Sequence, residues 1–277
     1  MNETASRREF SDLLARPDAE IDLAHAALLI AREEYPELDV AAYRLRLDAL
    51  GAAFAAEPQA AGAADAVRAL GRYLFEQERF HGNTEDYYDP RNSFLNDVLD
   101  RRTGIPITLA LVYIEVARRA GIAAAGVGLP GHFVVRVDSP EGGLLVDPFY
   151  GGALLSPEDC QARLDRAYGG KVRLELAMLA SCSQRQVLAR MLRNLKAIYL
   201  GAEDPERAWR AVDLLLRVQP GSLEDLRDRG LLHASLGCHA AAARDLEAYL
   251  EQAPGAPEAH SLLDRIVELR RLAARLN

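Results

Sequence analysis

The sequence predicts an α+β protein that is mostly helical, with a helical N-terminal part, a small core of antiparallel strands and C-terminal helical hairpins. Three observations support this fold class. Apolar residues recur at helical spacing over the first 80 residues, the pattern changes to strand-like alternation between 123 and 147, and a 34-residue period follows residue 183. We expect two domains, residues 1–180 and 181–277.

The N-terminal part predicts four helices separated by turn formers. Pro17, Pro36 and Pro58 interrupt the apolar periodicity, since proline removes a backbone donor and restricts the residue before it. The expected helices cover the residues before Pro17, then 22–34, 39–56 and 63–80. The polar stretch 81–92 is rich in turn formers and predicts a loop. A short helix should follow it and end at Thr103-Gly104.

A central buried helix should begin at Pro106, because proline at the first helical position loses no hydrogen bond and has a suitable φ. Strands are expected at 123–128, 132–137 and 144–146, with His132 at the start of the second and Asp147 on the returning strand. If residues 139–142 form the turn, His132 and Asp147 share one face of the sheet within reach of each other. A slip of one residue would place them on opposite faces.

A helix N-terminus, a histidine and a carboxylate in this order outline a papain-like or transglutaminase-like site. Such a site needs a cysteine at the start of the helix, where this chain has Pro106. Thr108 lies nearby but lacks the terminal amine that activates a threonine nucleophile. The alternative is that His132 is an ordinary strand-edge residue and Asp147-Pro148 a turn. We favour an inherited site.

The segments PITLALVYIEVARRAGI, GHFVVRV and LVDPF resemble the core of the bacterial transglutaminase-like superfamily. Together with YYDPRNSFLNDVLDRRTGIPITLA, GLPGHF and DPFYGG, they resemble the SirB-type branch, a transglutaminase-like domain followed by tetratricopeptide repeats. The resemblance implies that Pro106 occupies the family's cysteine position and that His132 and Asp147 match the other two members. The additional candidates for lining the cleft are Asn92, Thr108 and Tyr150.

The C-terminal part carries a repeat. Pro220 and Pro254 are 34 residues apart, and aligning them places Ala208 on Ala242, as in tetratricopeptide repeats, where small residues let paired helices approach. The expected helix pairs are 189–200 with 204–217 and 223–236 with 239–252, followed by a last helix at 257–276. An ordinary array of helical hairpins is the alternative interpretation.

Composition limits the classes of ligand. A net charge of −8 and a pI near 5.4 argue against nucleic acid and anionic membranes as partners. We expect no cofactor and no metal, because no metal-binding spacing links the candidate ligands, which are His81, Glu85, Asp86, Asp89 and His132. Three widely spaced cysteines, the lack of a signal peptide and the lack of an apolar span predict a cytoplasmic protein.

These observations lead to one main hypothesis, a non-catalytic transglutaminase-like protein that binds an unidentified protein or peptide and uses its repeats as an interaction surface. An alternative is a hydrolase that uses His132 and Asp147 with water as nucleophile. A third possibility is that the repeats only pack against the core and bind nothing.

Overall fold

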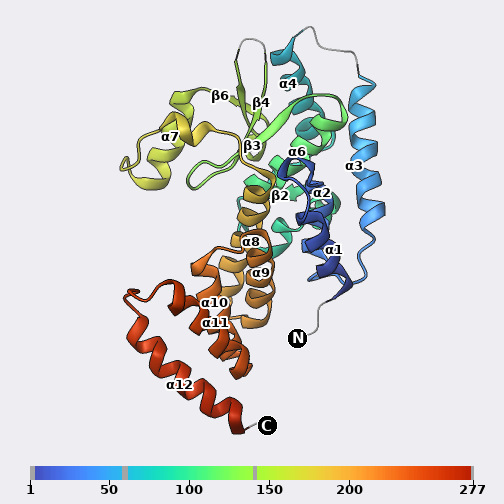
Figure 1. Ribbon diagram of the computed structural model, residues 1–277. Helices are drawn as coiled ribbons and strands as arrows, with labels where there is room; N and C mark the ends of the chain where they lie inside the picture. Colours follow the sequence, from blue (N-terminus) through green and yellow to red (C-terminus); the bar gives the residue numbers. More distant parts are fainter. Residues whose placement is uncertain (1–3, 58–61, 140–141, 276–277) are drawn as a thin grey trace. The chain divides into compact units, whose positions relative to one another are not determined.

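A computed structural model describes residues 4–57, 62–139 and 142–275. It confirms the predicted α+β, mostly helical class. Along the chain, helices precede and follow a small antiparallel sheet (Figure 1). The chain divides into two compact units, Met1–Met191 and Leu192–Asn277. Within the described residues, no helix is long and apolar enough to cross a membrane.

The first unit begins with helices whose N-termini are capped as side-chain chemistry predicts. Thr4, Asp22 and Asp39 each accept a hydrogen bond from a backbone N–H in the first turn of the helix that follows. The helices are α1 (Ala5–Leu14), α2 (Leu23–Ala31), α3 (Val40–Ala55) and α4 (Ala63–Gly71). The prediction of a single helix at 63–80 is wrong in its second half, where α4 passes into a π-helical turn at Arg72–Gln77.

The stretch expected to be only loop contributes a strand. β1 (His81–Gly82) pairs in parallel with β2 (Thr103–Gly104). A 3₁₀ turn at Pro90–Ser93 and helix α5 (Leu95–Arg101) lie between them. A two-residue strand is too short to show a period, so neither strand was predicted.

The centre of the first unit is α6 (Pro106–Arg119), a helix buried along nearly its whole length. It packs against α3 on one side and against β3 (Ala124–Val127) and β4 (Val134–Val137) on another (Figure 1). β5 (Leu144–Asp147) and β6 (Ala153–Leu155) complete an antiparallel sheet in the order β3-β4-β5-β6. A 3₁₀ turn, Pro148–Tyr150, and helix α7 (Pro157–Tyr168) follow β5 and β6 in the chain.

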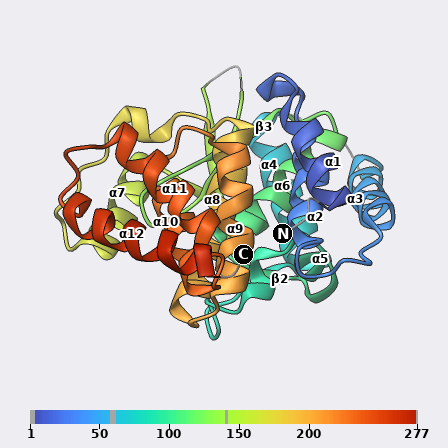
Figure 2. The ribbon, with the colours of Figure 1, turned by 60° about the horizontal axis from the view of Figure 1, so that its bottom comes forward.

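Helix α8 (Gln184–Gly201) runs from the first unit into the second, which contains α9 (Pro205–Val218), α10 (Leu223–Ser235), α11 (His239–Gln252) and α12 (Ala259–Arg275). The helices predicted at 204–217, 223–236 and 239–252 are confirmed to within one residue, and the one predicted at 189–200 begins earlier, at Gln184. α10 and α11 lie side by side (Figures 1 and 2), and a Cβ on Gly230 would lie 2.8 Å from Leu246. The close approach of these two helices therefore requires a residue without a side chain at position 230.

Candidate functional site

His132 and Asp147 form a direct pair. β4 and β5 are aligned with Val135 opposite Val146 and Val137 opposite Leu144, the register that the assumed turn requires. The Nε2 atom of His132 lies 2.8 Å from the Oδ2 atom of Asp147. The His132 side chain is 12% exposed and that of Asp147 is fully buried, so the imidazole reaches solvent while the carboxylate behind it does not.

The carboxylate of Asp147 has further partners that saturate it. Arg163 of α7 donates to the same Oδ2 atom, with Nη2 at 2.7 Å and Nε at 2.9 Å. The Oδ1 atom of Asp147 accepts hydrogen bonds from the backbone N–H groups of Phe149 and Tyr150 and so caps the 3₁₀ turn. Burial alone would raise the pKa of Asp147, but hydrogen bonds and positive charge from His132 and Arg163 outweigh it and hold the pKa below its usual value.

Two aromatic rings lie beside the imidazole, and two more continue from them. The ring centroids of Phe149 and Tyr150 lie 6.2 and 5.9 Å from that of His132, and Tyr87 contacts Phe149 at 6.1 Å and Tyr88 at 5.3 Å. Three of these rings reach solvent, with exposed fractions of 39% for Tyr87, 75% for Tyr88 and 50% for Tyr150. We call Tyr87, Tyr88, Phe149 and Tyr150 the aromatic platform.

The N-terminus of α6 is closed by polar contacts of its own. Pro106 is the first helical residue and is buried. The hydroxyl of Thr108 donates to the carbonyl of Asn92 at 2.7 Å and accepts from the N–H of Ile105 at 3.1 Å. A hydroxyl that caps the helix in this way has a structural role.

Of the three additional cleft candidates, only Tyr150 is exposed. Thr108 and Asn92 are fully buried. The Asn92 amide donates to the carbonyl of Asp86 at 2.7 Å, and its oxygen accepts from Asn83 at 3.2 Å. These two bonds lie within the loop 83–92, and the bond from Thr108 to the Asn92 carbonyl joins that loop to the first turn of α6.

Two of the cysteines lie in surroundings that disfavour a thiolate. Burial raises the pKa of Cys160 and also that of Cys182, which opposes formation of a thiolate. Among the described residues, no group of three or more histidine, cysteine or carboxylate side chains is arranged to hold a metal ion. The His81 ring instead lies 3.1 Å from the Thr103 hydroxyl.

Two arginines of the site were missed by sequence reasoning. Arg163 binds Asp147, and its guanidinium stacks over the ring of Tyr150 at 5.2 Å. Arg190 of α8 donates to the carbonyl of His132 at 3.1 Å. Each lies on a helix distant in sequence from the strands, and no local pattern shows which turn of such a helix faces the site.

Comparison with known proteins agrees with this architecture. The transglutaminase-like superfamily matches residues 41–193 and the tetratricopeptide repeat matches 195–266. A UPF0162 protein of Xylella fastidiosa (strain 9a5c) is 39% identical over 264 residues, which cover 94% of each chain. A UPF0162 protein of Pseudomonas aeruginosa is 35% identical over 89% of this chain and 90% of its own. F-box only protein 21 of Homo sapiens is 30% identical over 61% of this chain and 28% of its own.

Proposed function

The chain belongs to the transglutaminase-like superfamily, and we propose that it is a protein- or peptide-binding member whose core does not carry out covalent catalysis. The tetratricopeptide repeats provide a second interaction surface. The proposal places the chain in the SirB-type branch and in the cytoplasm, where its three free cysteines stay reduced.

The observation that carries the proposal is Pro106. It is buried at the first position of α6, where the family resemblance places the nucleophilic cysteine. A helix N-terminus and an oriented histidine activate a thiol by lowering its pKa, and proline has no group for them to activate. His132 therefore has the carboxylate of Asp147 as its partner, but the chain supplies no nucleophile at position 106.

The aromatic platform supports binding as the use of this surface. Tyr150 lies beside His132, and Tyr87 and Tyr88 extend the aromatic surface from Phe149. Each of the three tyrosines is at least 39% exposed. Tyrosine gives a large contact area at a low cost in conformational entropy, which is why it is enriched at protein interfaces. An extended peptide lying across these rings would reach His132 without any covalent step.

In the second unit, α12 offers an apolar stripe. Leu263 and Val267 are 55% and 64% exposed and lie four residues apart, so they share one face of the helix. Two large apolar side chains exposed together on a repeat helix suit a protein partner better than solvent.

The first test asks whether the surface recognises protein. The full chain is immobilised, and the proteins that it binds are compared with the proteins bound by two double variants. These variants are Tyr88→Ala/Tyr150→Ala and Leu263→Glu/Val267→Glu. We expect one set of proteins to be lost with each double variant. Arg68→Ala, an exposed change elsewhere in the first unit, is the matched control and should retain both sets. Equal recovery by all variants would contradict the proposal.

A second test concerns the chemistry. Purified protein is incubated with thioester, ester and transglutaminase substrates, and turnover that is abolished by His132→Ala would refute a purely binding role. Pro106→Cys provides the complementary measurement, because a cysteine placed there should react with iodoacetamide through a thiolate whose pKa lies below about 8.5. The additional change His132→Ala should slow that reaction near neutral pH.

The alternative function is a hydrolase in which His132 activates water. The specific observation in its favour is the 2.8 Å contact between His132 and the buried carboxylate of Asp147, the arrangement that orients a general base. The substrate panel separates the two functions, because water-based hydrolysis does not depend on residue 106.

A further inference from the structure

Arg190 of α8 is a half-buried arginine beside the His132 surface, and its charge has no partner. Its side chain donates from Nη2 to the carbonyl of His132 at 3.1 Å, and it forms no ion pair with the residues that the structure describes. A guanidinium carries several further N–H donors. Charged side chains that are partly removed from water are usually paired with an opposite charge. Arg190 can therefore bind an anion that the described part of the chain does not supply.

The neighbours of Arg190 hold its guanidinium in place. The charged group lies over the ring of Phe133, with Cζ 5.9 Å from the ring centroid. A Cβ on Gly128 would lie 3.9 Å from Nη1, so backbone lies close beside the charged group. The hydrogen bond to the His132 carbonyl adds a third contact. An arginine whose planar group is already oriented loses less conformational freedom when it binds a carboxylate.

The positive charge of Arg190 acts on the aromatic platform. Burial raises the pKa of Tyr87, and the charge of Arg190 opposes this rise. The other groups that act on this hydroxyl are Tyr88 and Tyr150, and no carboxylate of the described residues is among them. Burial also raises the pKa of Cys182, and Arg190 is again the charged group that opposes the rise. The surface beside Tyr87 is therefore locally basic, although the whole chain has a net charge of −8.

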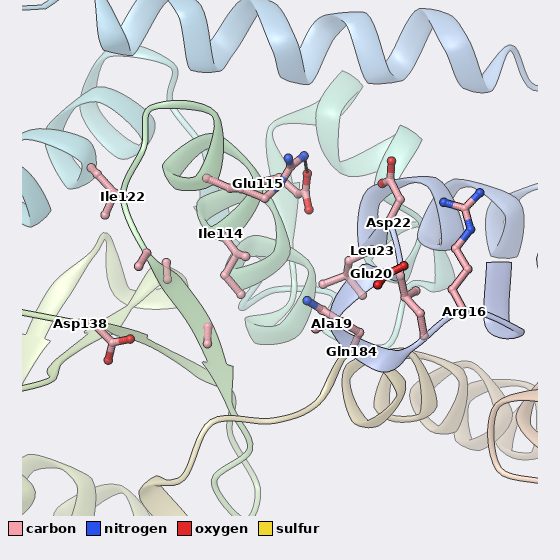
Figure 3. A pocket seen from close by; sticks show the side chains of 15 residues that line it. Arg16, Ala19, Glu20, Asp22, Leu23, Ile114, Glu115, Ile122, Asp138 and Gln184 are labelled. Atoms are coloured by element: carbon pink, nitrogen blue, oxygen red, sulfur yellow. Dashed lines mark hydrogen bonds and ion pairs between the residues drawn. The ribbon is translucent and has the colours of Figure 1, made fainter.

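Other charged groups in the first unit have partners within the chain. Arg163 stacks over Tyr150, but Asp147 pairs with its guanidinium at 2.7 Å. A cavity of about 520 Å3 elsewhere in this unit (Figure 3) is lined by three carboxylates that are likewise paired, in Asp22–Arg44, Glu115–Arg118 and Asp138–Arg136. Its fourth carboxylate, Glu20, is exposed, as is Arg16. These charges do not indicate a ligand, and Arg190 differs from them in having no opposite charge beside it.

We propose that Arg190 is the anchor for a carboxylate of the bound peptide, so that the segment recognised at the aromatic platform is acidic. The carboxylate comes from an aspartate or glutamate side chain or from a free C-terminus. It accepts charge-assisted hydrogen bonds from the guanidinium N–H groups that the His132 carbonyl leaves free, while apolar side chains of the peptide lie on Tyr87 and the neighbouring rings. The anchor role rests on the proposed function, because it names the chemistry of the partner at that same surface.

The probes are three hexapeptides that carry the same uncharged dye at the N-terminus, measured by fluorescence anisotropy with the full chain. The acidic peptide alternates phenylalanine and glutamate and has an amidated C-terminus. The neutral peptide alternates phenylalanine and glutamine and is also amidated, and the third peptide is the neutral one with a free C-terminal carboxylate. We expect a carboxylate to strengthen binding by about tenfold or more over the neutral peptide. A gain for the acidic peptide indicates a side chain as the source of the carboxylate, and a gain for the third peptide indicates a C-terminus.

The matched protein variants change the charge at residue 190. Arg190→Gln removes the charge but keeps a donor for the His132 carbonyl, so it should abolish the preference for a carboxylate and leave binding of the neutral peptide unchanged. Arg190→Glu should reverse the preference, so that a hexapeptide of alternating phenylalanine and lysine binds more tightly than the acidic peptide. A merely structural role of Arg190 would not produce this reversal. Arg8→Gln removes an exposed charge from α1 and is the control that should keep the preference.

Equal binding of all three peptides by the unaltered chain, or a preference that survives Arg190→Gln, would overturn the anchor role. The proposed function would survive that result if Tyr88→Ala/Tyr150→Ala weakened binding of all three peptides. Absence of binding at millimolar protein would also overturn the anchor role, and the proteins captured by the immobilised chain would then decide the proposed function separately. If the Arg190 variants do not fold, phenylglyoxal modification of the unaltered chain decides, because the peptide that carries the preferred carboxylate should protect Arg190 and the neutral peptide should not.

Discussion

Asp147→Ala tests whether the buried carboxylate holds the site together. The change removes the partner of His132 and of Arg163 and the cap of the turn at Phe149. Breaking a buried ion pair by removing one partner costs about 3–5 kcal/mol, and loss of a cap costs about 1 kcal/mol. Because these contributions share one carboxylate and are not additive, we expect a total loss of about 4 kcal/mol.

Urea and thermal unfolding followed by circular dichroism measure this loss. For a domain of this size, 1 kcal/mol corresponds to roughly 2–4 °C, so the first transition should fall by about 8–16 °C. The control is Asp138→Ala, whose carboxylate is 73% exposed and whose ion pair with Arg136 is 3.3 Å long. It should change stability by less than about 0.5 kcal/mol. A loss below about 1 kcal/mol for Asp147→Ala would refute the structural role given to the pair.

Three further predictions concern stability. Since the folded-state pKa of Asp147 is below its usual value, its contribution to stability is present above about pH 4 and is lost as pH falls through the folded pKa. The free energy of unfolding of Asp147→Asn should therefore decrease less steeply as the pH is lowered. Gly82→Ala should cost about 1–3 kcal/mol in a urea titration, because its Cβ would lie 2.6 Å from an aromatic ring, whereas Gly201→Ala, which meets nothing within 4 Å, should be neutral. Lys196→Met should cost about 3 kcal/mol in the second unit, measured by tryptophan fluorescence, because Asp225 would be left buried without its amine partner at 2.8 Å.

The register of the central hairpin was predictable because loop length and side-chain alternation constrain it together. Once residues 139–142 are assigned to the turn, His132 must lie opposite residue 149 and diagonal to Asp147, and the two side chains meet at 2.8 Å. The repeat helices were predictable for a similar reason. Their period repeats over 34 residues, so each helix boundary is supported twice.

The features that were missed arise from packing between distant segments. The π-helical turn at Arg72–Gln77 lies where a Cβ on Gly152 would contact Phe75 at 2.9 Å and the Cα of Gly71 at 3.1 Å. That contact joins segments about 80 residues apart, so the local apolar period predicts an uninterrupted helix. Arg163 was missed for the same reason, since α7 reads as an ordinary capped surface helix.

Arg163 adds an argument about chemistry that Pro106 alone does not supply. A general base becomes positively charged when it takes a proton, and a carboxylate behind it helps by stabilising that charge. Here His132 and Arg163 both bond the Oδ2 atom of Asp147, at 2.8 and 2.7 Å. The permanent charge of the guanidinium compensates part of the negative charge of this carboxylate. Because two side chains from different elements bond one oxygen, His132 and Arg163 are held in fixed positions around Asp147, which is what the proposed recognition surface requires.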